Sequence, residues 1–160
     1  MRRALSLLLI LVLLLSLTSC SDEVHAQHCE LGIVLPKDFM EIDTDASFDL
    51  AYSDGDAVVG LTRLSFDAVF ESGIPATVSV RELAELYQAS HGVKHIIYAY
   101  GDTVYYSYTV ERDGAVYIYM PTFYKTPYAF FVITFILHGA GEWTAEEALA
   151  LTSSVYLVNG

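Results

Sequence analysis

Four short apolar runs follow one another in the second half of the chain, and a turn signal separates each run from the next. The runs span residues 94–100, 104–112, 116–124 and 129–137. They are rich in Tyr, Val, Ile and Phe, as β-strands are. The separators are Gly101-Asp102, Asp113-Gly114 and Thr126-Pro127. Links this short join antiparallel neighbours, so the pattern predicts a β-meander. The last run has almost no polar position, which is typical of a strand buried on both faces.

Shorter extended segments precede the meander. An apolar stretch at 31–35 ends at Pro36-Lys37-Asp38, which predicts a turn. Residues 48–53 and 57–65 flank the Gly-containing turn Asp54-Gly55-Asp56 and predict a hairpin. The segment 66–76 has no clear period, and we interpret it as a loop, with a single helical turn as the alternative.

Two capping boxes predict helices. Ser79 and Glu82 open a helix over about 79–90, and Thr144 and Glu147 open a second one, followed by a short extended segment at 155–157. We therefore expect an α+β fold, in which an antiparallel sheet of six or seven strands carries helices packed on both faces.

The N-terminus has the layout of a secretory signal, because Arg2 and Arg3 precede an apolar run over 4–17. Leu17-Thr18-Ser19-Cys20 resembles the lipobox of bacterial lipoproteins. This resemblance implies cleavage before Cys20 and acyl chains, such as palmitate, on that residue. The alternative is an ordinary signal peptide with a chance cysteine. We expect a signal peptide at 1–19, a lipid-anchored tether at 20–29 and a single domain at 30–160.

Composition restricts the partners. Twenty acidic residues oppose eight basic ones, for a formal charge of -12, so nucleic acid is excluded as a partner. An anionic bilayer would also repel the chain. The lipid is therefore the expected anchor, on the extracytoplasmic side of the cell membrane. If Cys20 is acylated, Cys29 has no partner for an internal disulfide, since these are the two cysteines of the chain.

The element order resembles the PsbP/Mog1-like fold. The likeness rests on residues 34–39, on Val132-Ile133-Thr134-Phe135 and on the closing segment 144–155. It implies an αβα sandwich that serves as a scaffold for partners, as in photosystem accessory subunits, small-GTPase-binding factors and bacterial lipoproteins. No site motif of the family is present, so no residue role follows from it.

Tyrosines are the main candidate for a binding surface. Side chains two residues apart share a face of a strand, which places six tyrosines in three pairs: Tyr98 and Tyr100, Tyr106 and Tyr108, and Tyr117 and Tyr119. Together they predict an aromatic contact patch, a surface type that is common at interfaces. The alternative is that a helix covers this face.

Metal and cofactor sites are not expected. Residues 43–49 and Asp54 have the oxygen spacing of a calcium loop, but Phe48 stands where the turn requires Gly. His25, His28 and Cys29 lie in the expected tether, and no second ligand pair follows at zinc-finger spacing. Cys29 is either buried in the first strand or a free thiol.

No nucleophile with a base and an orienting group is recognisable. His138 and Glu142 flank a glycine-rich connection without a nucleophile-elbow serine or cysteine. We therefore expect a non-catalytic, lipid-anchored module that binds a protein or a small ligand. The alternatives are a small surface hydrolase that uses His138 or the acidic loops, and an accessory subunit of a membrane complex.

Overall fold

The computed structural model describes residues 23–44, 47–75, 77–90, 92, 95–100 and 103–158. The predicted signal peptide, Cys20 and the first residues of the predicted tether lie outside these ranges. The strands are β1 (Glu23–His28), β2 (Leu31–Pro36), β3 (Met40–Ile42), β4 (Leu50–Ser53), β5 (Ala57–Ser65), β6 (Tyr98–Tyr100), β7 (Thr103–Tyr105), β8 (Tyr108–Arg112), β9 (Ala115–Lys125), β10 (Ala129–His138) and β11 (Tyr156–Leu157). The helices are α2 (Phe66–Glu71), α3 (Val80–Ser90), α4 (Ala145–Leu151) and the 3-10 helix η1 (Thr152–Ser154).

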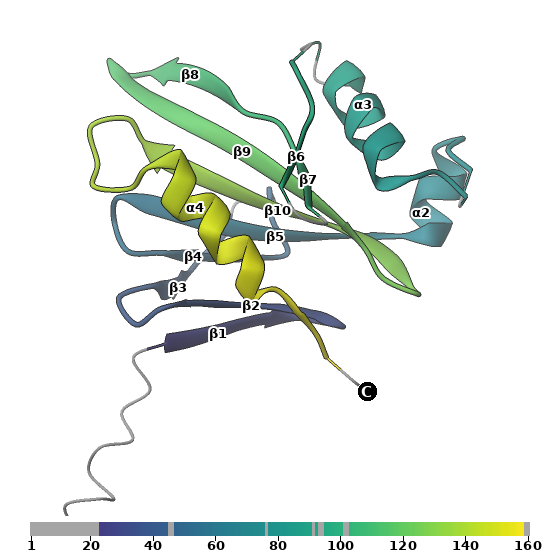
Figure 1. Cartoon of the computed structure of the whole chain (residues 1–160), viewed down its shortest axis with the longest axis horizontal. Coiled ribbons are helices and arrows are strands. Elements are labelled where there is room, and N and C mark those ends of the chain that lie inside the picture. The colour runs from purple at the N-terminus through teal and green to yellow at the C-terminus, as the bar shows by residue number, and fades with distance from the viewer. Residues whose placement is uncertain are drawn as a thin grey trace, which may run out of the picture.

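These strands form two antiparallel sheets (Figure 1). The small sheet has the order β1-β2-β11. The large sheet has the order β3-β4-β5-β10-β9-β7-β6, and β8 pairs with β9 beside β7. In Figure 1, α2 and α3 lie at one end of the large sheet, and the loop between β10 and α4 lies at the other.

The central strand is β10, between β5 and β9. Its residues from Ala129 to Phe135 are all buried, which confirms the prediction of a strand covered on both faces. Phe131, Ile133 and Phe135 belong to a core shared with the small sheet and α4. Phe130 and Val132 belong to a second core shared with α2 and α3. The large sheet therefore has a small-sheet face and an α3 face.

The predicted α+β sandwich with six or seven strands and helices on both faces is wrong. The described chain is mostly antiparallel β, with eleven strands in two sheets and three short α-helices. On one face, residues of β1 and β2 supply much of the cover that a helix was expected to give. On the other face, the eleven residues of α3 are about 16 Å long. The large sheet is seven strands and about 29 Å across at the usual strand spacing, so α3 is too short to cover it.

The correction also concerns the predicted tether. Its residues Glu23–His28 form β1, which pairs along its whole length with β2, from Glu23 opposite Pro36 to His28 opposite Leu31. Glu23, His25 and Gln27 are exposed while Ala26 is buried, which is the alternation of a half-buried strand. No helix among the described residues is long and apolar enough to cross a membrane.

The predicted run 104–112 is split into β7 and β8 by Tyr106 and Ser107. Val104 lies opposite Phe123 and Tyr108 opposite Tyr119, so both strands keep one register on β9. The break lies opposite Pro121, which has no backbone N–H to donate to the ladder. The Tyr106 amide still donates to the Pro121 carbonyl at 3.4 Å.

Local signals set the helix starts. The Thr144 hydroxyl accepts from the Glu147 amide and the Glu147 carboxylate accepts from the Thr144 amide, a complete capping box. Ser79 and Glu82 make the same reciprocal bonds before α3. The segment interpreted as a loop contains α2, whose N-cap is Ser65.

Candidate functional site

The six predicted tyrosines do not form one patch. Tyr98 lies opposite Tyr105, and Tyr105 packs on the core of the small-sheet face. Tyr98 and Tyr100 therefore point to the small-sheet face, where they are 45% and 49% exposed. Tyr106 and Tyr108 pack with Phe123 in or against the core on the α3 face, and Tyr119 and Tyr117 share that face with Phe123. The pleat places the first pair and the other four tyrosines on opposite faces.

Tyr106 is a core residue and not a contact residue. It is 1% exposed and stacks on Phe123 at 5.9 Å and on Tyr108 at 6.0 Å. Tyr108 then stacks on Tyr119 at 5.3 Å. Burial raises the pKa of both the Tyr106 and Tyr108 hydroxyls, and neighbouring tyrosines raise them further. For Tyr106 the predicted alternative of a covered face is therefore correct.

Tyr108 and Tyr119 end a line of side chains that crosses six strands of the α3 face. Each member lies opposite the next: Met40, Ser53, Val58, Ile136, Tyr119 and Tyr108. We call this line the open row. Its members are half-buried, apart from Met40, which is 70% exposed. At strand spacing the row is about 24 Å long.

Among the described residues, the close contacts of the helices are on the other part of this face. The close packing of α2 is on β5, and that of α3 is on β7 and β9. Tyr117 and His138 lie next to the open row, with their rings edge to face at 5.4 Å. The open row is therefore a strip of mostly aliphatic and aromatic side chains, beside the α3 core, on which none of the described helices packs closely.

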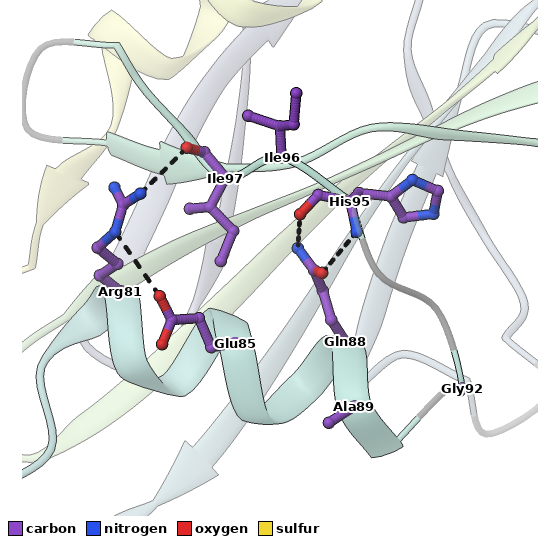
Figure 2. A pocket seen from close by; sticks show the side chains of 8 residues that line it. All are labelled: Arg81, Glu85, Gln88, Ala89, Gly92, His95, Ile96 and Ile97. Carbon is purple, nitrogen blue, oxygen red and sulfur yellow. Dashed lines mark hydrogen bonds and ion pairs between the residues drawn. The ribbon is translucent and has the colours of Figure 1, made fainter.

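A cavity of about 700 Å³ lies between α3 and the segment 95–97 (Figure 2). The Gln88 side chain, only 4% exposed, donates from Nε2 to the His95 carbonyl at 3.2 Å. Its Oε1 accepts from the His95 amide at 2.8 Å. Arg81 Nε lies 3.7 Å from a Glu85 carboxylate oxygen, and its Nη2 donates to the Ile97 carbonyl at 3.4 Å.

These contacts pair the Gln88 and Arg81 side chains with groups of the protein itself. Gln88 and Arg81 hold the segment 95–97 to α3, and the His95 ring stacks on Tyr106 at 6.0 Å and Tyr108 at 5.5 Å. Within the described residues His95 Nε2 is buried without a hydrogen-bond partner. The contacts of Gln88 and Arg81 thus place the His95 ring beside Tyr108 at the end of the open row. Among the described residues, the cavity offers no unpaired charge to a ligand. Sequence reasoning missed Gln88, because a glutamine in a helix gives no signal of burial.

A second cavity, of about 450 Å³, lies at the end of the sheet where the turns meet. Its lining comes from the β2–β3 turn, the β4–β5 turn, the loop before α4, and α4 itself. We call it the Trp143 cavity, and its lining residues are Pro36, Asp38, Asp54, Glu142, Trp143, Glu147, Ala150 and Leu151. Sequence reasoning missed it as well. The available signal was the single tryptophan of the chain, directly after Glu142.

The residues considered for catalysis and metal binding are placed apart or paired unproductively. His138 Nδ1 accepts from the Ala140 amide at 3.3 Å. His28 Nε2 lies 3.7 Å from Cys29 Sγ and 3.5 Å from Asp49 Oδ2. A nucleophile–base–orienter triad needs both ring nitrogens, so this trio is not one. Cys29 is exposed and not buried in a strand.

The expected absence of a metal site remains a prediction. His25 and His28 lie on opposite faces of β1 by the strand period, and the His25 ring contacts Tyr156. The structure gives no group of three His, Cys, Asp or Glu placed for a metal within the described ranges. Thr44 donates to the Phe48 carbonyl four residues on, and Asp49 accepts from the Arg63 amide of β5. Residues 45 and 46 of the calcium-like segment lie outside the description.

Comparison with known proteins gives the fold and no function. No family model matches the sequence, and no curated protein matches it. A crystal structure from Bacteroides thetaiotaomicron VPI-5482 is similar, with a TM-score of 0.61, 14% identity and coverage of 87% of this chain. The chain spans about half the length of that neighbour. At this identity the likeness concerns the fold alone, and the resemblance to PsbP/Mog1-like proteins stays a prediction.

Proposed function

We propose that this protein is a non-catalytic binding module, anchored to the extracytoplasmic side of the cell membrane by lipid at Cys20, which holds a basic polypeptide on its open row. The observation that carries the proposal is the uncovered strip of the α3 face. A strip about 24 Å long accommodates an extended segment of about seven residues. Half-buried tyrosines give such a segment a large contact area at a low entropic cost.

The charge of the protein determines the kind of partner. The chain carries a net charge of -12, so a second copy of the chain would be repelled. Asp56, whose carbonyl accepts from the His138 amide at 3.0 Å, lies in the β4–β5 turn beside the open row. Asp113 lies in the β8–β9 turn, beyond Tyr108 on the same hairpin. Tyrosine faces also attract ammonium and guanidinium groups. Lys and Arg side chains on an apolar segment suit both features.

The anchor would place the domain close to the membrane. An extended chain from Cys20 to Glu23 reaches about 10 Å, and β1 begins at Glu23. The domain is therefore expected to lie against the bilayer, and not at the end of a long tether. Glu23 lies opposite Pro36, so the membrane-facing end is the one that holds the Trp143 cavity.

Lipidation is tested by palmitate labelling of the full chain in bacterial cells. Cys20→Ser should abolish the label, because the acyl group is attached to that thiol. Cys29→Ser is the matched control and should keep it. Equal labelling of the Cys20 variant would refute the anchor.

Binding is tested by fluorescence anisotropy of labelled seven-residue peptides added to the full chain. A peptide of alternating Lys and Leu should bind, and its Glu and Leu counterpart should not. Tyr119→Ala should weaken binding about tenfold, on the scale of an interface aromatic. Tyr128→Ala is the control, because Tyr128 is 69% exposed in the β9–β10 turn, outside the open row. Equal binding of both peptides, or equal effects of both variants, would refute the proposal.

A further inference from the structure

The Trp143 cavity has a wall that is fixed before any ligand arrives. Trp143 Nε1 donates to Asp54 Oδ2 at 2.6 Å, and its ring meets the buried Phe39 ring edge to face at 5.6 Å. Asp54 is itself held, because its Oδ1 accepts from the amides of Asp56 and Ala57 at 3.0 and 2.8 Å. The indole is half-buried, so part of it remains open to the cavity. A pre-organised aromatic wall lowers the entropic cost of binding.

The rest of the cavity combines aliphatic surface with negative charge. Pro36, Ala150 and Leu151 supply the apolar lining. Four carboxylates line it, from Asp38, Asp54, Glu142 and Glu147, with no Lys or Arg among the lining residues.

Two of these carboxylates have structural roles and two do not. Asp54 holds the indole, and Glu147 accepts from the Thr144 amide and hydroxyl at 2.8 and 2.7 Å. Asp38 and Glu142 are exposed, and neither has a hydrogen bond or ion pair to another described residue. Their charges therefore remain available to a cation that enters the cavity.

We propose that the Trp143 cavity binds an organic cation on an alkyl stem, with the chemistry of a lysine side chain. The stem packs on Pro36 and Leu151, and the ammonium group lies near the indole between Asp38 and Glu142. An aromatic wall with nearby carboxylates is a favourable environment for an alkylammonium group. The volume of about 450 Å³ is within the usual range of small-ligand sites. A bare metal ion would gain nothing from the aliphatic lining.

The test uses the fluorescence of Trp143, the single tryptophan of the chain. The full-length protein is titrated with Nα-acetyl-lysine amide and, separately, with Nα-acetyl-norleucine amide, which has a similar stem without the charge. A saturable change with the lysine compound alone supports the proposal. Equal changes with both compounds would show an apolar site and overturn it. Saturation by calcium chloride at lower concentrations than the lysine compound would show a metal site and also overturn it.

Variants separate this cavity from a general effect of charge. Asp38→Asn with Glu142→Gln should weaken lysine-amide binding about two- to thirtyfold, the sum of two exposed charge contacts. Glu146→Gln with Glu111→Gln, two exposed residues outside the lining, is the charge-matched control and should leave binding unchanged. Equal loss in the control would refute a defined site. Urea unfolding midpoints of the variants verify that each one folds.

This inference does not depend on the open row. Tyr119→Ala should leave the binding of Nα-acetyl-lysine amide unchanged, because Tyr119 is absent from the cavity lining. If the unmodified protein binds Nα-acetyl-lysine amide but not the Lys and Leu peptide, the proposed function alone is refuted. If it binds the peptide but not the lysine amide, the cavity proposal alone is refuted.

Discussion

Replacing Gln88 with alanine removes the side chain that holds the segment before β6 to α3. Two hydrogen bonds are lost, at 2.8 and 3.2 Å, and the amide and carbonyl of His95 lose their partner. Each bond contributes about 1 kcal/mol net, and a buried group left unpaired costs about 1–3 kcal/mol. Partial access of water to the segment reduces the second figure. We expect the free energy of unfolding to fall by about 2–4 kcal/mol, a large share of the 5–15 kcal/mol of a typical domain.

Urea unfolding of the full chain measures this loss, and hydrogen exchange of the His95 amide shows where it occurs. Gln27→Ala is the control, because Gln27 is exposed and its side chain donates one long bond, 3.4 Å, to the Cys29 carbonyl. That change should cost less than about 0.5 kcal/mol. A loss below about 1 kcal/mol for Gln88→Ala, or unchanged protection of the His95 amide, would refute the role assigned to Gln88.

Three further predictions concern stability, each measured by urea unfolding. Burial, together with nearby tyrosines, raises the pKa of Tyr106. Its contribution to the free energy of unfolding is therefore complete below about pH 10, the pKa in the unfolded chain, and is lost as pH rises above that value. Tyr106→Phe should reduce this alkaline loss of stability, and an unchanged dependence of stability on pH would contradict the assignment. Burial opposes ionisation of Glu30, but hydrogen bonds, above all the one from Arg63, outweigh burial and lower the pKa of Glu30. Stability should therefore fall as pH drops below about 4.3. Glu30→Gln should flatten that fall, and an equally steep fall in the variant would contradict this role of Glu30. A Cβ on Gly60 would clash with the Phe48 ring, so Gly60→Ala should cost about 1–3 kcal/mol. The cost should be smaller in a Phe48→Ala background, and an equal cost in both backgrounds would exclude this clash.

Features with a local cause could be predicted from the sequence. The apolar run of β10 requires cover on both faces, and the hairpin at Asp54-Gly55-Asp56 and the capping boxes depend on neighbouring residues. In each case the information lies within a few positions of the chain. These elements appear near their predicted positions.

The cover of the sheet depended on distant contacts and was predicted wrongly. Glu23–His28 alternates as a half-buried strand does, but the nearby lipobox-like motif favoured the interpretation as a tether. The partner of β1 is β2, and a sequence does not show that two such strands will replace a helix as cover. The predicted sandwich failed at this point.

The candidate sites failed for a related reason. The period of a strand places tyrosines two apart on one face, but the register between strands determines whether the pairs meet. Tyr98 and Tyr119 lie on opposite faces because of that register. The Trp143 cavity combines segments as distant as Asp38 and Leu151, and no local pattern connects them.

The most direct test of the proposed function is site-specific photocrosslinking in native membranes. A benzoylphenylalanine placed at Tyr119 should give one discrete adduct with a polypeptide of net positive charge. The adduct should disappear when the Lys and Leu peptide is added in excess, and the same group at Tyr128 should not form it. An acidic adduct, an adduct that the peptide does not displace, or equal crosslinking at Tyr128 would contradict binding of a basic polypeptide on the open row.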